Sequence, residues 1–163
     1  MSEQMQVTTA DLCDADAAAQ VIGLPWRHYG GRQRMQGPVV TLMSPGSVGL
    51  VRDTLTQPGD GRVLLVDGGG ALTCALLGDR LGGQAVANGW AGVIIHGAVR
   101  DIAILATLPL AVMALGSCPK RGQLESFGQS GVPVDVGGVL VEPGRHIVAD
   151  EDGVVVLPSP PVA

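Results

Sequence analysis

The sequence RVLLVDGGG at residues 62–70 contains four consecutive apolar residues, followed by an aspartate and three glycines. A short apolar run bounded by turn residues is typical of a strand that is buried on both faces, as in a parallel sheet. Two similar runs follow, at residues 92–97 and 110–115. Helices are expected between these strands, at residues 78–88 and 101–106. The alternation predicts a parallel sheet whose strands are joined by right-handed crossovers.

The flanking sequence predicts further elements on both sides of this unit. Residues 9–22, with Thr9 as the expected cap, and residues 47–55 favour helices, and residues 39–43 favour a strand. The last part of the chain contains short apolar runs separated by glycine, proline and acidic turns, which predict antiparallel hairpins. These runs are residues 132–136, 139–141, 146–149 and 154–157. We therefore predict an α/β fold with a parallel core sheet and an added antiparallel β layer. It forms a single domain over residues 1–163, with a core at 9–157 and a loose tail at 158–163.

Composition excludes several classes of function. The chain has 163 residues, a net charge of −5, one lysine and four aromatic residues, so it lacks the basic and stacking surfaces that nucleic acids require. It contains no apolar stretch long enough to span a membrane. Residues 1–6 do not have the pattern of a signal peptide. The three cysteines are widely spaced, which predicts neither disulfides nor a zinc site and fits the reducing cytoplasm.

Polar residues gather where the predicted strands end. Ligands of open α/β sheets bind beyond the carboxyl ends of the strands, where Arg100 and Asp101 stand. The helix expected to begin at Gly78 would present unpaired amides at residues 78–81, which attract an anion. An arginine can grip a carboxylate, and an aspartate can hold a divalent cation. Together these residues predict a site for a small keto acid and a metal. The alternative is that Arg100 and Asp101 form only a surface ion pair or a helix cap.

The motifs of this chain closely resemble those of the RraA-like family, over roughly residues 9–157. That family includes metal-dependent 4-hydroxy-4-methyl-2-oxoglutarate aldolases and protein regulators of ribonuclease E. The motifs are specific as a set, although none is specific alone. They are VDGGG at 66–70, ALLGD at 75–79, NGWAG at 88–92, HGAVRD at 96–101 and ALG at 114–116, together with DLCD at 11–14, GGR at 30–32 and AD at 149–150.

The resemblance implies a swivelling β/β/α domain that assembles as a homotrimer, or as a hexamer, with sites between subunits. It implies that the amides of Gly78, Asp79, Arg80 and Leu81 bind the substrate carboxylate. It also implies that Arg100 binds substrate and that Asp101 binds Mg²⁺ or Mn²⁺. One position departs from the family, because Ile104 stands where its aldolases often carry another acid.

The expected chemistry is cleavage of a 4-hydroxy-2-oxo acid to pyruvate, with oxaloacetate decarboxylation as a second activity. Both reactions pass through a pyruvate enolate, which enzymes stabilise with a Schiff-base lysine or a metal ion. The single lysine, Lys120, is expected in a solvated loop, so the metal mechanism is favoured. The alternative function is a non-catalytic trimeric inhibitor of ribonuclease E in the cytoplasm.

Two other features have a functional and a structural interpretation. The DGGG at residues 67–70 resembles the first motif of S-adenosylmethionine methyltransferases, but Ala71 replaces a glycine and the chain ends too soon for that fold. A tight turn is the simpler interpretation. His96 is expected either at a subunit contact or satisfied core position, or as a proton carrier near the site.

Overall fold

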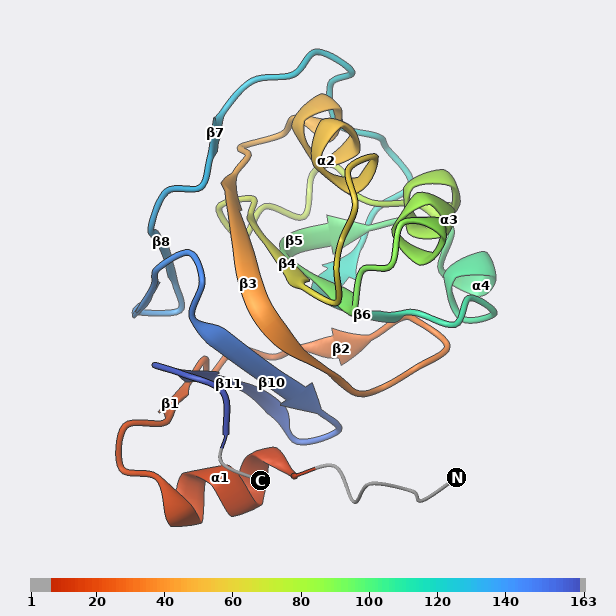
Figure 1. Cartoon of the computed structure of the whole chain (residues 1–163). Helices are drawn as coiled ribbons and strands as arrows, with labels where there is room; N and C mark the ends of the chain where they lie inside the picture. Colours follow the sequence, from red (N-terminus) through yellow and green to blue (C-terminus); the bar gives the residue numbers. More distant parts are fainter. Residues whose placement is uncertain (1–6, 162–163) are drawn as a thin grey trace.

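The computed structural model describes residues 7–161 as four helices and eleven strands (Figure 1). The helices are α1 (Thr9–Ala15), α2 (Val48–Leu55), α3 (Asp79–Ala87) and α4 (Ile102–Leu105). The strands are β1 (Gln20–Val21), β2 (Arg27–His28), β3 (Met35–Met43), β4 (Val63–Asp67), β5 (Gly92–Val99), β6 (Ala111–Ser117), β7 (Gln129–Ser130), β8 (Val134–Val136), β9 (Val139–Val141), β10 (His146–Asp150) and β11 (Gly153–Leu157).

The predicted parallel core is confirmed. Strands β3, β4, β5 and β6 lie side by side and pair in parallel. The apolar residues of β4 are fully buried, as expected for a strand covered on both faces. Leu64 and Val66 pack toward the side of α2, α3 and α4, whereas Val63 and Leu65 belong to a second core on the opposite face. Figure 1 shows these three helices together on one side of the parallel strands.

The antiparallel layer is also confirmed, and β3 connects it to the parallel core. Residues 35–38 of β3 pair with β10, and residues 39–43 pair with β4. Strand β10 then pairs with β11, and β11 with β1, all antiparallel. Apolar residues of β8, β9, β10 and β11 pack with those of the parallel strands in the second core. The α/β fold class is therefore as predicted, with two β layers and one helical layer.

The first helix is shorter than predicted and is capped by a different residue. Helix α1 ends at Ala15, where residues up to 22 were expected to be helical. The carboxylate of Asp16 accepts the amide of Ala18, which favours a turn over another helical turn. The following residues pair with β11 instead. Thr8, not Thr9, caps the helix, and the hydroxyl of Thr9 donates to Asp150.

Both ends of the chain extend beyond the residues that the structure describes. The predicted lack of a signal pattern at residues 1–6 lies outside the described residues, as does the end of the expected tail at 162–163. Residues 158–161 follow β11 without regular secondary structure. Within residues 7–161, no helix is long and apolar enough to cross a membrane.

Candidate active site

All six site residues predicted from the sequence line one hollow of about 320 Å³. Its walls come from α2, the N-terminal end of α3, the loop after β5 and the irregular segment after β6. The lining residues are Val48, Arg52, Ala75, Leu77, Gly78, Asp79, Arg80, Leu81, Arg100, Asp101, Arg121 and Leu124. The volume suits a small ligand, because ligand pockets commonly begin at about 300 Å³. The structure therefore brings Gly78–Leu81 together with Arg100 and Asp101, as the spacing predicted.

The N-terminal end of α3 already holds carboxylates of the chain. The amide of Asp79 donates to Oδ2 of Asp101 over 3.1 Å, and the amide of Arg80 donates to Oδ1 of Asp79 over 2.8 Å. Gly78 precedes the helix without a side-chain cap. Two of the expected free amides are thus occupied. Their occupants are themselves carboxylates, which demonstrates that this end of the helix accepts an anion, as its dipole predicts.

Close packing fixes Gly78 against the two polar residues after β5. A Cβ added at Gly78 would lie 2.6 Å from Oδ2 of Asp101 and 3.3 Å from Cγ of Arg100. The backbone amide of Arg100 donates to the carbonyl of Leu77 over 2.9 Å, which joins the two segments. Only glycine leaves room for the Asp101 carboxylate at the start of α3.

Asp101 has a left-handed backbone conformation, with φ of 57° and ψ of 40°. This conformation is uncommon outside glycine, although aspartate adopts it more readily than most residues. It turns the chain sharply between β5 and α4, so that the carboxylate meets α3. Non-glycine residues in such conformations often occur at functional sites.

Both structural alternatives for Arg100 and Asp101 are present in part, as an exposed ion pair and as a carboxylate that accepts the first amide of α3. Nε of Arg100 lies 3.9 Å from Oδ2 of Asp101, and both side chains are more than one-third exposed, at 37% and 35%. Such an ion pair contributes little. Asp101 precedes α4, but its side chain makes no capping bond to that helix. Its carboxylate is instead directed to the neighbouring helix α3.

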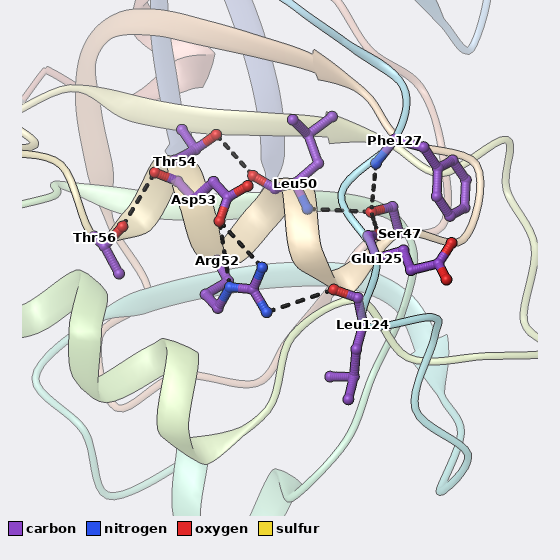
Figure 2. Close-up of polar contacts among 9 residues, drawn as sticks. All are labelled: Ser47, Leu50, Arg52, Asp53, Thr54, Thr56, Leu124, Glu125 and Phe127. Atoms are coloured by element: carbon purple, nitrogen blue, oxygen red, sulfur yellow. Dashed lines mark hydrogen bonds and ion pairs between the residues drawn. The ribbon is translucent and has the colours of Figure 1, made fainter.

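The sequence did not indicate four other lining residues. Arg52 and Val48 come from α2, and Arg121 and Leu124 come from the segment after β6. Backbone bonds place this segment: the amide of Ala75 donates to Lys120, and the amide of Gly122 donates to Ala75. Figure 2 shows the guanidinium of Arg52 directed at the carbonyl of Leu124, 3.5 Å away, and at Asp53. The segment lacks periodicity, and its sequence predicted only a solvated loop around Lys120.

The carboxylates of the pocket fit a hard divalent cation held mainly by other oxygens. Asp79 and Asp101 are its only acidic lining residues, and Oδ1 of Asp101 accepts no hydrogen bond from residues 7–161. The part of the chain that the structure describes contains no cluster of three or more candidate metal ligands. Mg²⁺ commonly binds through one or two carboxylates with water and substrate completing the shell. The donor set matches that pattern and does not match a closed structural metal site.

His96 lies outside the pocket lining. Its Nδ1 is 2.9 Å from Oδ1 of Asp67, which also accepts the amide of Gly69. The glycine-rich loop after β4 is therefore a turn held by Asp67, as the simpler interpretation expected. His146 is buried, and that burial lowers its pKa by disfavouring the charged imidazolium. The three cysteines are free, as predicted.

The sequence profile of the RraA-like family, described as Aldolase/RraA, matches residues 9–156. The chain belongs to the RraA-like family. A relative from Deinococcus radiodurans is 55% identical over 152 residues, which cover 93% of this chain and 94% of the relative. It carries the name "Putative 4-hydroxy-4-methyl-2-oxoglutarate aldolase". The predicted family is thereby confirmed.

Two solved structures of this RraA-like fold carry different functional names. One is described as the "RNA-processing inhibitor RraA from Thermus thermophilis"; it is 43% identical, has a TM-score of 0.94 and covers 98% of this chain and 97% of its own. The other, from Geobacillus kaustophilus, is described as an S-adenosylmethionine:2-dimethylmenaquinone methyltransferase. It is 44% identical, has a TM-score of 0.91 and covers 94% of this chain and 96% of its own. The shared fold therefore does not by itself specify the function.

Proposed function

We propose that this RraA-like protein is a divalent-metal-dependent lyase that cleaves 4-hydroxy-4-methyl-2-oxoglutarate, or a related 4-hydroxy-2-oxo acid, to pyruvate. The observation that carries the proposal is the single pocket in which Gly78–Leu81, Arg100 and Asp101 meet. The aldolase name of the Deinococcus relative supports the same reaction class. Oxaloacetate decarboxylation is proposed as a second activity, because it yields the same enolate.

The residues of the pocket can meet the main demand of this reaction. Retro-aldol cleavage breaks the C3–C4 bond, removes the proton of the 4-hydroxyl and leaves negative charge on the keto oxygen. Arg100 offers guanidinium donors to the 2-oxo acid. At the start of α3 the amides of Asp79 and Arg80 are occupied by carboxylates of the chain, which leaves the amides of Gly78 and Leu81 for the substrate carboxylate. The only lysine, Lys120, is exposed and does not line the pocket, so the pocket lining contains no residue that could form a Schiff base.

Asp101 is the residue that would hold Mg²⁺ or Mn²⁺, through its Oδ1, which accepts no hydrogen bond from residues 7–161. When bound, the cation supplies Lewis-acid stabilisation of the developing enolate charge. Ile104, which replaces the additional acid of the family's aldolases, is 48% exposed on α4 and does not line the pocket.

A homotrimer or hexamer in the cytoplasm is part of the same proposal. Ile102 and Ile104 are large apolar side chains that are 43% and 48% exposed beside Asp101. Neighbouring exposed apolar residues are typical of a surface that a partner covers. Light scattering coupled to gel filtration would measure the assembly, and a monomeric mass would contradict it.

Inhibition of ribonuclease E is a second candidate function. It is favoured by the similarity to the Thermus RNA-processing inhibitor over nearly the whole of both chains. A pull-down with purified ribonuclease E and an RNA-cleavage assay would test it independently of catalysis. A methyltransferase is not proposed, because the loop of residues 67–70 does not line the pocket.

Pyruvate release in a coupled lactate dehydrogenase assay tests the lyase. We expect turnover of 4-hydroxy-4-methyl-2-oxoglutarate and of oxaloacetate with Mg²⁺ or Mn²⁺, and its loss with EDTA. If neither substrate yields pyruvate above the rate with metal alone, the lyase proposal is wrong.

A further inference from the structure

A small apolar cluster docks helix α1 on the hairpin of β10 and β11. It is separate from the two large cores that flank the parallel strands. Its buried members are Leu12 of α1 and Val148, Val155 and Leu157 of the hairpin, with Ala19 at its border. Figure 1 shows α1 below β10 and β11, at the opposite end of the molecule from α2. Because few apolar residues hold α1, its local opening should require less free energy than global unfolding.

Two titratable side chains lie in the same row of β10 as Val148. Side chains two residues apart in a strand point to the same face, so His146, Val148 and Asp150 share the face that α1 covers. Asp150 binds α1 directly, because it accepts the amide and the hydroxyl of Thr9 over 2.8 and 2.7 Å. His146 lies at the other end of the row, in register with Leu157 of the cluster.

The imidazole of His146 is poorly satisfied in this position. The residue is only 7% exposed, and its Nδ1 is buried without a hydrogen-bond partner among residues 7–161. Its Nε2 lies 3.4 Å from Oε1 of Gln36, which is long for a hydrogen bond. Burial lowers the pKa of His146. The neutral ring is therefore tolerated, whereas the imidazolium would be a buried charge without compensation.

The charged groups around this face do not pair with the imidazole. Strands β1, β3 and β11 contain no charged residue. Beside His146 in the chain, Arg145 pairs with Glu142 over 3.1 Å, and at the other end of β10 Arg34 pairs with Glu151 over 2.9 Å. The remaining charged residues of α1 and the adjoining turns are the exposed Asp11, Asp14, Asp16 and Asp152. Within residues 7–161, no carboxylate forms an ion pair with His146, and burial is the cause of its lowered pKa.

We propose that His146 is a pH-sensitive latch for α1: protonation of its imidazole releases the helix from the hairpin while the parallel core stays folded. Release admits water to the imidazole, so the released state binds a proton more tightly than the docked state. The released population should therefore grow as the pH falls below about 6.5, the ordinary pKa of histidine, and level off below the lowered pKa of the docked state. Neither α1 nor β10 contributes to the pocket lining, so the latch does not depend on the lyase reaction.

Asp150 sets the baseline strength of the docking and does not cause this response. Burial would raise its pKa, but the hydrogen bonds from Thr9 and Asp152 outweigh burial and lower it. The carboxylate therefore stays ionised down to about pH 5, because its pKa lies below the ordinary value of about 4. A change in α1 docking between about pH 7.5 and pH 5 belongs to histidine, whose ordinary pKa falls in this range.

Hydrogen exchange at the amides of Leu12 and Asp16 tests the latch, because these amides donate to the carbonyls of Thr8 and Leu12 in α1. After correction for intrinsic exchange rates, we expect their protection factors to fall about 5- to 30-fold between about pH 7.5 and pH 5, the upper limit for one histidine of ordinary pKa. At both pH values they should stay at least about tenfold below those of β4, as expected for local release. Constant protection of α1, or protection equal to that of β4, would overturn the proposal.

Two variants remove the titrating group. His146→Leu places an apolar side chain beside Leu157, and His146→Gln retains a polar one. In each, α1 protection should vary by less than about twofold over the same pH range. His28→Leu is the matched control, because its Nδ1 is also buried without a partner among the described residues, but β2 lies at the opposite edge of the sheet from β1. It should keep the wild-type response.

Circular dichroism would verify that each variant is folded before exchange is measured. A wild-type pH response in the folded His146 variants would refute the latch. Loss of the response in His28→Leu would refute it as well, because the effect would then not be specific to the face that α1 covers.

Discussion

At the scale of single residues, the absence of a side chain at Gly78 determines where the Asp101 carboxylate lies. The Asp101 carboxylate fits against the start of α3 because Gly78 has no side chain. Asp101 reaches this position only through its left-handed backbone. Two local features, one at a helix start and one at a strand end, therefore determine where the carboxylate lies.

Gly78→Ala should displace the Asp101 carboxylate, because the new Cβ would lie 2.6 Å from its Oδ2. We expect kcat/KM for pyruvate release to fall by about tenfold or more, since small misplacements of reacting groups are costly. Gly83→Ala is the matched control in the same helix, where an added Cβ has no neighbour within 4 Å. It should keep its activity and gain up to about 1 kcal/mol of stability. Equal activity of the two variants would contradict the importance of this contact.

At the scale of elements, the buried Ser47 joins helix α2 to the irregular segment after β6 by hydrogen bonds. Oγ of Ser47 accepts the amide of Leu50 over 3.1 Å, which caps the helix. The same oxygen donates to the carbonyl of Glu125 and accepts the amide of Phe127 (Figure 2). A single side chain thus positions both α2 and the segment that carries Leu124 into the pocket lining.

Ser47→Ala should lower the free energy of unfolding by about 1–3 kcal/mol, through loss of the cap and of buried hydrogen bonds. It should also raise KM, because the segment around Leu124 loses its anchor. Thr56→Ala is the control, since its exposed hydroxyl only donates to the carbonyl of Asp53 at the other end of α2. Urea unfolding and steady-state kinetics would measure both effects; a stable variant with unchanged KM would refute this linkage.

The elements that sequence predicted best are those with a complete local signal. Strand β4 is an uninterrupted apolar run, and α3 begins after Gly78 and ends near Gly89, so their bounds agree closely with expectation. Helix α1 was predicted too long because the alanines after Asp16 favour a helix. In the structure, Gln20 and Val21 pair with β11 as strand β1. Strand β3 pairs with both β10 and β4, and this pairing depends on tertiary contacts that no local sequence pattern specifies.

The same distinction applies to the candidate site. Arg100 and Asp101 were predictable because strand ends carry ligands and because their motif resembles that of a family. Arg121 was not, because its position depends on backbone bonds between Ala75 and the neighbouring residues Lys120 and Gly122. Such contacts between irregular segments leave no periodicity in the sequence.

At the scale of the whole molecule, Asp150 of β10 joins the C-terminal hairpin to Thr9 of α1. This buried carboxylate accepts the amide and the hydroxyl of Thr9, over 2.8 and 2.7 Å, which docks α1 on the final hairpin. Burial alone would raise the pKa of Asp150. The hydrogen bonds from Thr9 and from the amide of Asp152, with the charge of Arg34, outweigh burial and lower the pKa.

A lowered pKa makes this link sensitive to acid. Asp150 should contribute its full stability above the unfolded pKa of about 4 and lose it as the pH falls through the lower folded pKa. Asp150→Asn should therefore cost about 1–3 kcal/mol at neutral pH and progressively less at more acidic pH. Denaturant unfolding at several pH values would measure this difference. Asp14→Asn, at an exposed position of α1, should differ from wild type by less than about 0.5 kcal/mol throughout.

Asp101→Asn tests most directly whether the Asp101 carboxylate supports metal-dependent cleavage. Asparagine retains an oxygen that can accept the Asp79 amide, so the fold should persist while the charge is lost. We predict that pyruvate release from 4-hydroxy-4-methyl-2-oxoglutarate with Mg²⁺ falls by about 100-fold or more in the variant, with an unchanged circular dichroism spectrum. Asp14→Asn, at an exposed position of α1 and outside the pocket lining, should keep the wild-type rate. Wild-type turnover that resists EDTA, or an Asp101→Asn variant as active as wild type, would contradict the account.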